Sequence, residues 1–489
     1  MRKSYALLIA ILLIGLFFRT YKATERFEFA HDGDLYSWVV KDIVINHHIR
    51  LIGQVTSAPG IFIGGLFYYL LIPFFLLSKM DPIGTVYFSI VLGLITITSL
   101  YFVLTKLFKE EAGLIGAYLY ATLLTTVNVD RWVVPTITTN LWVVWYFYCI
   151  VSIVRGNFRI LPLLGILIGL IWHAHIALLP VLIAIPAAII LSKKIPSQKQ
   201  VFQFLIFLFL SSLPFIIFEL KHNFQQIKAF IVNFGTSRAG PTGLYKFGIV
   251  LNMISKNINS LLFEPQSFKL TNNIFFVFII LLSAFWLVRR KILLQKELVV
   301  FITWILGAIT FFSFSSSPVS EYYFSNIDMI FLSLITLNLY LFYKTFKIGK
   351  ILVIGLLILI SFKNGYFMIT QSYYNKGYLE KKAVVSYINQ DAKSKGYPCI
   401  GISYITDPGE NVGFRYLFYL KGTHLIHPSL DVPVYNIVIP EELSQKEVKQ
   451  KFGHIGLIPP TTIPSREVIE KSCQTPNTNI TDSLFGYVD

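Results

Sequence analysis

Two aspartates that follow the first apolar segment are the best candidates for chemistry in this chain. Asp32 and Asp34 come shortly after an apolar run near residues 5–21. Only 14% of the 489 residues are charged, and carboxylates near apolar surroundings are costly to keep without a function. A carboxylate placed there can take a proton from an acceptor hydroxyl. It can also hold a divalent metal ion (Mg, Mn or Zn) that neutralises a departing phosphate.

The same two acids have a second interpretation in local structure. Apolar residues recur at helical spacing over residues 34–48, which predicts an amphipathic helix on the membrane surface. Aspartate is a common N-cap just before a helix. Capping by Asp32 or Asp34 therefore stands beside the catalytic interpretation, and both roles can coexist.

The composition places the chain among polytopic membrane proteins. Hydrophobic residues make up 55% of the chain, and the mean hydropathy is +0.63, which is more apolar material than a soluble surface can cover. The net charge of +16 comes from Lys and Arg in short clusters between apolar runs. Such clusters indicate membrane topology, so we expect membrane lipids and no nucleic acid as partners.

Eleven apolar runs have the length that a helix needs to cross about 30 Å of hydrocarbon. A twelfth run, residues 60–79, is ambiguous, and it is interrupted by Pro and Gly. The predicted spans lie near residues 5–21, 84–105, 112–128, 136–154, 160–173, 176–192, 200–218, 273–289, 298–316, 323–343 and 351–368.

The distribution of basic residues decides how the ambiguous run is treated, because short cytoplasmic loops carry an excess of Lys and Arg. If residues 60–79 do not cross, fourteen Lys and Arg residues fall in the inner loops and one, Arg131, in the short outer loops. We therefore expect residues 60–79 to lie along the outer interface. The N-terminus is then cytoplasmic, with a retained signal-anchor helix, and the protein is multi-pass in the plasma membrane.

This topology leaves three long outer segments, at residues 22–83, 219–272 and 370–489. The last one has lower apolar density and two β-prone runs, 399–404 and 432–439, which predict a small extracytoplasmic α/β domain. Cys399 and Cys473 both lie there, so one disulfide between them is an open alternative. The predicted fold class is thus an all-α polytopic membrane protein of about eleven spans over residues 1–369, with outer juxtamembrane helices and a C-terminal α/β domain.

Residues 29–34, which read Phe-Ala-His-Asp-Gly-Asp, and residues 49–73 resemble the first outer loop of membrane glycosyltransferases of the GT-C fold. The similar enzymes are bacterial relatives of the dolichyl-phosphate-mannose protein mannosyltransferases and the lipid A aminoarabinose transferase. The resemblance covers roughly residues 1–340. It implies that the acidic motif of Asp32 and Asp34 is catalytic, that the donor is a sugar on a polyprenyl phosphate, and that transfer inverts the anomeric carbon.

The second outer loop supplies two further candidates for substrate binding. The family places a second acid here, or an Arg with Asn-Pro, and this chain has Asp130 and Arg131 followed by Trp132 and, three residues on, Pro135. By resemblance, Asp130 matches a metal or substrate acid and Arg131 meets a phosphate. The alternative is an ordinary ion couple of Asp130 with Arg131 at the interface.

Three more polar clusters are candidates at the outer ends of predicted spans. Each also has a structural interpretation: interfacial histidines satisfied by water, a lysine that snorkels, and tyrosines of the interface belt. The substrate-binding candidates in these clusters are His173 and His175, Lys221 and His222, and Tyr322 and Tyr323.

The function that these features predict is sugar transfer by a hexosyl- or pentosyltransferase with a lipid-carried donor. The inner loops are too short for a nucleotide-binding domain, and the acceptor is a lipid, protein or glycan. A lipid-linked glycan flippase or transporter is the first alternative, but the spanning cores carry almost no acids apart from Asp328. The second alternative is an oligosaccharide polymerase or ligase. Such an enzyme is expected to have its catalytic residues on a large outer loop late in the sequence, whereas the acidic motif here is on the first outer loop.

Overall fold

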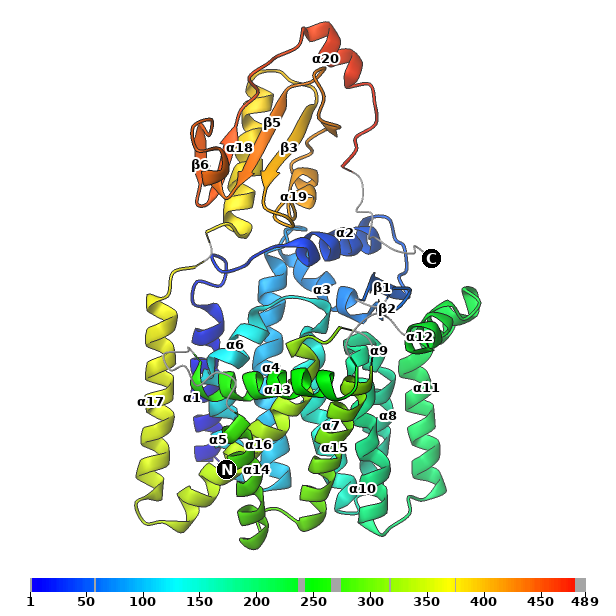
Figure 1. Ribbon diagram of the computed structural model, residues 1–489, viewed down its shortest axis with the longest axis vertical. Helices are drawn as coiled ribbons and strands as arrows, with labels where there is room; N and C mark the ends of the chain where they lie inside the picture. The colour runs from blue at the N-terminus through cyan, green and yellow to red at the C-terminus, as the bar shows by residue number, and fades with distance from the viewer. Residues whose placement is uncertain are drawn as a thin grey trace. The chain divides into compact units, whose positions relative to one another are not determined.

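The computed structural model describes residues 2–56, 59–235, 242–264, 274–315, 318–373 and 375–479, and it is mostly helical (Figure 1). The chain forms two compact units. The first comprises Met1–Tyr21, Leu51–Phe67 and Ser89–Gln371, and the second comprises Lys22–Arg50, Tyr68–Phe88 and Ser372–Asp489.

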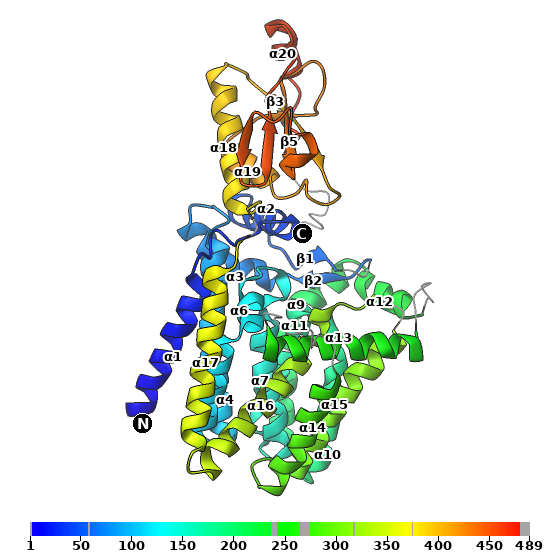
Figure 2. The same ribbon diagram turned by 60° about the vertical axis from the view of Figure 1, so that its left-hand side comes forward.

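The first unit is a helical bundle in which most helices run along one direction, while α13 runs across them (Figures 1 and 2). Short 3-10 turns η1 (Pro135–Thr138), η2 (Phe158–Ile160), η3 (Ile176–Ile183) and η4 (Glu321–Phe324) join several of them. The helices are α1 (Arg2–Thr20), α4 (Gly84–Leu107), α5 (Glu110–Thr122), α6 (Leu124–Arg131), α7 (Thr139–Val154), α8 (Leu161–Gly169), α9 (Ile171–Ala174), α10 (Ala184–Ser192), α11 (Gln198–Lys221), α12 (Gln225–Gly235), α13 (Leu244–Phe263), α14 (Ile274–Arg289), α15 (Gln295–Phe314), α16 (Ser325–Thr345) and α17 (Gly349–Thr370).

Each predicted span coincides with a helix or a pair of helices, but the described residues do not establish eleven crossings. Six helices are long and apolar enough to cross, and α5 with α6, bent by 63°, would make a seventh. The other four predicted spans correspond to shorter apolar helices of 10–17 residues. These are Ser4–Thr20, Phe158–Ala174, Ile176–Ser192 and Ile274–Arg289.

The ambiguous run at residues 60–79 forms strand β2 (Phe62–Gly64) and helix α3 (Leu66–Leu77). Strand β1 (Ile52–Val55) pairs with β2 in an antiparallel arrangement. Helix α3 has 12 residues and contains Pro73. Its length of about 18 Å is well short of the roughly 30 Å of a hydrocarbon core, as expected for a segment that does not cross.

The second unit combines a sheet with helices from both ends of the chain. The sheet has the order β4-β3-β5-β7-β6, with β3 parallel to β4 and β5, and β7 antiparallel to β5 and β6. The two β-prone runs of the sequence form β3 and β5. The elements are α2 (His31–Ile45), α18 (Tyr378–Ser394), β3 (Ile400–Thr406), α19 (Arg415–Leu420), β4 (Leu425–Ile426), β5 (Val434–Ile439), η5 (Glu441–Ser444), β6 (Gln450–Phe452), β7 (Ile455–Ile458) and α20 (Arg466–Ser472).

A disulfide joins Cys399, just before β3, to Cys473, just after α20. Their Cα atoms are 5.6 Å apart, which lies in the usual range for a disulfide. The bond packs against Ile426 and Val432 at the start of the sheet. The pairing that the sequence left open is thus present, while Cys149 is a buried free thiol.

Replacing both cysteines of this pair by serine is expected to destabilise the second unit by about 2–4 kcal/mol, because the bond closes a long loop in the unfolded chain. The measurement is thermal unfolding of the purified full-length protein, with Cys149→Ser as a matched control that leaves the disulfide intact. Mass spectrometry after denaturation and alkylation without reductant should find one modified thiol, that of Cys149. Three modified thiols would contradict the pairing.

Candidate active site

Helix α2 carries both catalytic candidates in its first turn. It begins at His31, earlier than the sequence predicts, and its N-cap is Ala30, which makes no side-chain capping bond. The prediction that Asp32 or Asp34 caps this helix is therefore wrong. Two acids in the first turn still interact favourably with the helix dipole. Most of the helix is buried on several sides, so it is not a surface helix with one wet face.

Asp34 is buried and fixed by a contact with the C-terminal part of the chain. The side chain is 3% exposed, and its Oδ1 accepts a hydrogen bond from the backbone N–H of Tyr416 at 2.9 Å. Tyr416 lies in the first turn of α19, where backbone N–H groups lack helical partners. The ring of Trp38, one turn along α2, lies 5.5 Å from that of Tyr416. Asp34 therefore attaches α19 to α2.

Asp32 is the more accessible of the two acids, with intermediate exposure. Two residues apart on an α-helix, Asp32 and Asp34 do not face each other. The Asp32 charge acts on Tyr36 one turn later: burial raises the pKa of Tyr36, the hydrogen bond with Thr85 opposes this, and Asp32 adds to the increase.

A buried lysine lies close to Asp34. The Nζ of Lys381 donates to the carbonyl oxygens of Phe29 at 3.1 Å and Val412 at 2.9 Å. Burial lowers the pKa of Lys381 to about 8, against the opposing effect of the Glu410 and Asp34 carboxylates. Lys381 thereby joins the segment before α2 to the segment before α19, and it supplies positive charge beside the acidic motif.

A second buried acid of α2, Asp42, forms an ion pair. Asp42 Oδ2 lies 3.2 Å from Nη2 of Arg50, and its Oδ1 lies 2.9 Å from Nδ1 of His48. Burial lowers the pKa of Arg50, and the charge of Asp42 opposes this. The Tyr69 hydroxyl accepts a hydrogen bond from the backbone N–H of Arg50 and donates one to the carbonyl oxygen of the same residue. These contacts fix the C-terminal end of α2.

In the first unit, Asp130 pairs with Arg19 and not with its neighbour Arg131. Arg19 Nε and Nη2 lie 2.9 and 2.5 Å from Asp130 Oδ2, and the Tyr120 hydroxyl donates to Oδ1 at 2.9 Å. Arg131 donates instead to the carbonyl of Tyr21 at 2.6 Å. The predicted interfacial couple of Asp130 with Arg131 is therefore wrong. Arg19 is 1% exposed, and the sequence alone does not predict it as the partner.

The two histidines of the predicted cavity make separate contacts. His173 is buried, and its Nδ1 accepts a hydrogen bond from the backbone N–H of Leu66 at 3.3 Å. His175 Nδ1 accepts from the backbone N–H of Ala177 at 3.1 Å. In the neutral ring of His175, the proton is consequently on Nε2, which leaves a hydrogen-bond donor for another group.

At the end of α11, Lys221 is exposed and His222 packs on its own helix. The His222 ring stacks on Phe218 with centroids 4.1 Å apart, and its Nδ1 lies 2.9 Å from the Phe218 carbonyl oxygen. Neighbouring Glu219 accepts hydrogen bonds from backbone N–H groups at the start of α12. The polar cluster therefore also serves the turn between α11 and α12.

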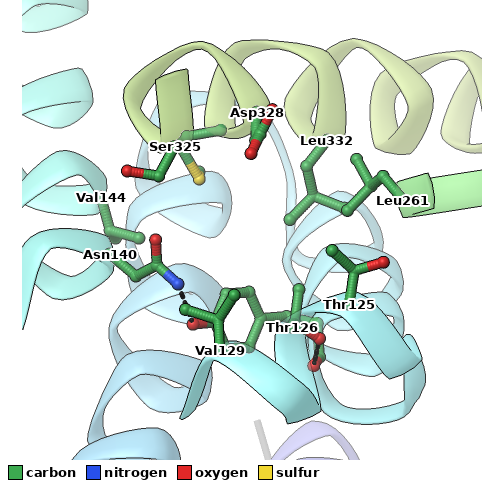
Figure 3. A pocket seen from close by; sticks show the side chains of 11 residues that line it. Thr125, Thr126, Val129, Asn140, Val144, Leu261, Ser325, Asp328 and Leu332 are labelled. Carbon is green, nitrogen blue, oxygen red and sulfur yellow. Dashed lines mark hydrogen bonds between the residues drawn. The ribbon is translucent and has the colours of Figure 1, made fainter. Parts of the chain in front are cut away.

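A cavity in the first unit gathers some of the predicted residues. Its volume is about 240 Å³, and an adjoining hollow of about 50 Å³ shares several lining residues. Figure 3 shows Asp328 and Ser325 of α16 across this hollow from Thr125. His175 and Tyr322 line the larger cavity, with ring centroids 5.5 Å apart.

No protein-family model and no curated protein matches this chain, but solved structures do. ArnT from Cupriavidus metallidurans bound to undecaprenyl phosphate superimposes with a TM-score of 0.57 at 10% identity, covering 94% of this chain and 99% of that one. The apo form of that protein gives a TM-score of 0.52 at 10% identity, with the same coverage. The Archaeoglobus fulgidus oligosaccharyltransferase complex with Zn and sulfate gives 0.50 at 13% identity, covering 96% and 76%.

This chain has the GT-C fold. The fold that the first outer loop implied is thereby confirmed, and the similarity extends over nearly the whole chain. At this identity the structural match establishes the fold alone, so the roles of individual residues depend on the local geometry described above.

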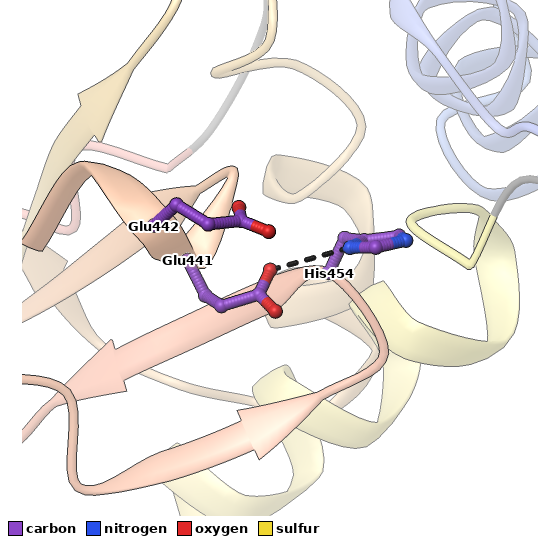
Figure 4. Close-up of side chains that lie close together, drawn as sticks. All are labelled: Glu441, Glu442 and His454. Atoms are coloured by element: carbon purple, nitrogen blue, oxygen red, sulfur yellow. Dashed lines mark ion pairs between the residues drawn. The ribbon is translucent and has the colours of Figure 1, made fainter. Parts of the chain in front are cut away.

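Among the described residues of this GT-C protein, one cluster has the composition of a metal site. Glu441, Glu442 and His454 place their ligand atoms within 4.8 Å of one another (Figure 4), and Glu441 Oε2 lies 3.4 Å from His454 Nδ1. Asp32 and Asp34 do not belong to a cluster of this kind. A metal requirement of the protein stays a prediction, which activity in the presence of a chelator tests.

The predicted site residues thus divide into several local groups. His175, Tyr322 and Tyr323 lie together, and the Tyr323 ring is 5.0 Å from His175. The remaining candidates of the first unit have other surroundings: Asp130 at Arg19, Arg131 at Tyr21, His173 at Leu66, and Lys221 and His222 at the end of α11.

Proposed function

We propose that this protein transfers a sugar from a polyprenyl-phosphate donor to an acceptor on the outer face of the membrane, with inversion at the anomeric carbon. The main support is the GT-C fold, which 94% of the chain shares with a protein whose structure holds undecaprenyl phosphate. A fold alone does not specify a function. The second support is the acidic motif of α2, in which Asp32 remains accessible while Asp34 is fixed.

In this proposal Asp32 takes the proton of the acceptor hydroxyl as it attacks the anomeric carbon, and the bond from that carbon to the phosphate oxygen breaks. The leaving polyprenyl phosphate is already an anion, so little acid catalysis is needed. Cationic side chains near the headgroup stabilise it, and Arg131, Lys221 and His222 are the candidates. Asp34 acts by positioning α2 against α19.

The proposed membrane topology keeps eleven spans, a cytoplasmic N-terminus and residues 370–489 outside the plasma membrane. The disulfide between Cys399 and Cys473 supports this, because disulfides persist in oxidising compartments and not in the cytosol. The basic residues of the predicted inner loops support the same orientation.

The decisive experiment offers the purified protein synthetic polyprenyl-phosphate hexoses and pentoses with a radiolabelled sugar, together with a membrane extract as acceptor. We expect label to leave the lipid and free polyprenyl phosphate to accumulate. A lipid flippase would move the intact donor between leaflets of a vesicle without cleaving it. Movement without cleavage would overturn the proposal in favour of that alternative.

A further inference from the structure

We propose that the cavity between α6, α7 and α16 is the binding site for an uncharged sugar ring, held by Asp328 and by the aromatic side chains at its mouth. This assignment deepens the proposed function and rests on it for the kind of substrate. The cavity lies within the first unit.

Two helical stripes form facing walls of this cavity. Thr125, Val129 and Trp132 follow one another at intervals of four and three residues along α6 and its end. Tyr322, Ser325 and Asp328 do so at intervals of three residues along η4 and α16. Such spacing puts each set on one face of its helix, so the polar and aromatic groups are directed into the same space.

The walls contain two buried polar atoms without a hydrogen-bond partner among the described residues. They are Oδ1 of Asp328 and Oγ1 of Thr139, and both residues line the cavity. A buried polar atom without a partner costs free energy and calls for a partner such as water or a ligand. A ring that carries several hydroxyl groups can donate to the carboxylate and bond the threonine at once.

The charge distribution favours a neutral ligand over a phosphate. Glu321 at the mouth is paired with Lys256 at 2.6 Å, and both side chains are about half exposed, at 52% and 49%. Among the described residues, no Lys or Arg lines the cavity. A phosphate would find no cation there to balance its charge, whereas ring hydroxyl groups can donate to the Asp328 carboxyl oxygen.

The mouth supplies apolar ring faces and a donor. The Trp132 and Tyr322 rings lie 6.1 Å apart at 78°, and His175 offers its Nε2–H beside Tyr322. Ligand sites usually combine such aromatic surface with a few convergent polar groups, in volumes of about 300–1,000 Å³. The volume of this cavity is about 240 Å³, just below that range, which suits a single sugar ring.

A carbodiimide-protection experiment tests the assignment without relying on transfer. The purified protein is treated with dicyclohexylcarbodiimide, which modifies carboxyl groups in apolar surroundings, and the peptide containing Asp328 is quantified by mass spectrometry. We expect methyl glycosides of hexoses and pentoses at millimolar concentration to lower modification of Asp328 at least threefold. Inorganic phosphate at the same concentration should leave it unchanged.

Two variants serve as matched controls in the same experiment. Tyr322→Leu is expected to abolish the protection while Asp328 remains modifiable, and Asp32→Asn, which lies outside this cavity, is expected to retain it. Unprotected Asp328 in a protein that transfers sugar would overturn this inference alone, and protection by phosphate would assign the cavity to an anion instead. Protection in a protein that transfers no sugar would overturn the proposed function and leave the binding site standing.

Discussion

Asp32→Asn is expected to lower sugar transfer by about 10²–10⁴-fold, the usual contribution of a general base, while the protein stays folded. Asparagine keeps the size and hydrogen-bonding capacity of the side chain but cannot accept the proton of the acceptor hydroxyl. The measurement is the initial rate of label transfer from the polyprenyl-phosphate sugar, together with the thermal unfolding temperature. Transfer at an undiminished rate would remove Asp32 from the mechanism.

The matched variants at Asp34 separate positioning from proton transfer. Asp34→Asn keeps an oxygen that can accept from the Tyr416 N–H, whereas Asp34→Ala leaves that buried donor without a partner, at a cost of about 1–3 kcal/mol. We expect Asp34→Ala to lower both the unfolding temperature and the activity, and Asp34→Asn to preserve much more of both. Equal loss of activity in the two variants with unchanged stability would instead indicate that Asp34 is itself catalytic.

Arg19→Ala is expected to destabilise the first unit by about 3–5 kcal/mol, because it leaves the buried Asp130 carboxylate without its cation. The guanidinium also donates to the carbonyl oxygens of Gly15, Tyr120 and Ala121, which would lose these bonds. The measurement is thermal unfolding in detergent, together with the fraction of protein that stays unaggregated after heating.

The double variant Arg19→Met with Asp130→Leu provides the control for this prediction. Replacing a whole buried ion pair by apolar side chains is often close to neutral, so the double variant should be more stable than Arg19→Ala. A double variant that transfers sugar at the normal rate would also show that Asp130 does not contact the substrate. Stability of Arg19→Ala equal to that of the unchanged protein would contradict the importance of the pair.

The sequence predicted the class of fold because hydrophobic length and charge asymmetry are properties of short segments. The two β-prone runs of the tail and the Pro and Gly that shorten the helix within residues 60–79 are likewise properties of short segments. The partner of Asp130 could not be predicted, since Arg19 lies 111 residues away and adjacency favoured Arg131. The one indication in the sequence is that Arg19 is a charged residue near the end of an apolar segment, where it needs a partner.

The contacts of the acidic motif also depend on residues that are distant in the sequence. Its position near the start of a helix was predicted, but Ala30 and not an aspartate is the N-cap. The distinction between Asp32 and Asp34 depends on Tyr416, and no periodicity links residues so distant along the chain. The sequence predicts His175 and Tyr322 as substrate-binding residues, but it does not predict the cavity, because the walls combine α6, α7 and α16.

The bond from Tyr416 to Asp34 joins residues 382 positions apart, and this has a consequence for biogenesis. The ribosome makes α2 among the first elements, but α19 emerges only after the helices of the bundle have been synthesised. A nascent chain therefore holds an incompletely supported acidic loop throughout its insertion. The loop can reach its final structure only after the last sixth of the polypeptide has been synthesised. Truncated products that lack α19 therefore lack the contact that fixes Asp34.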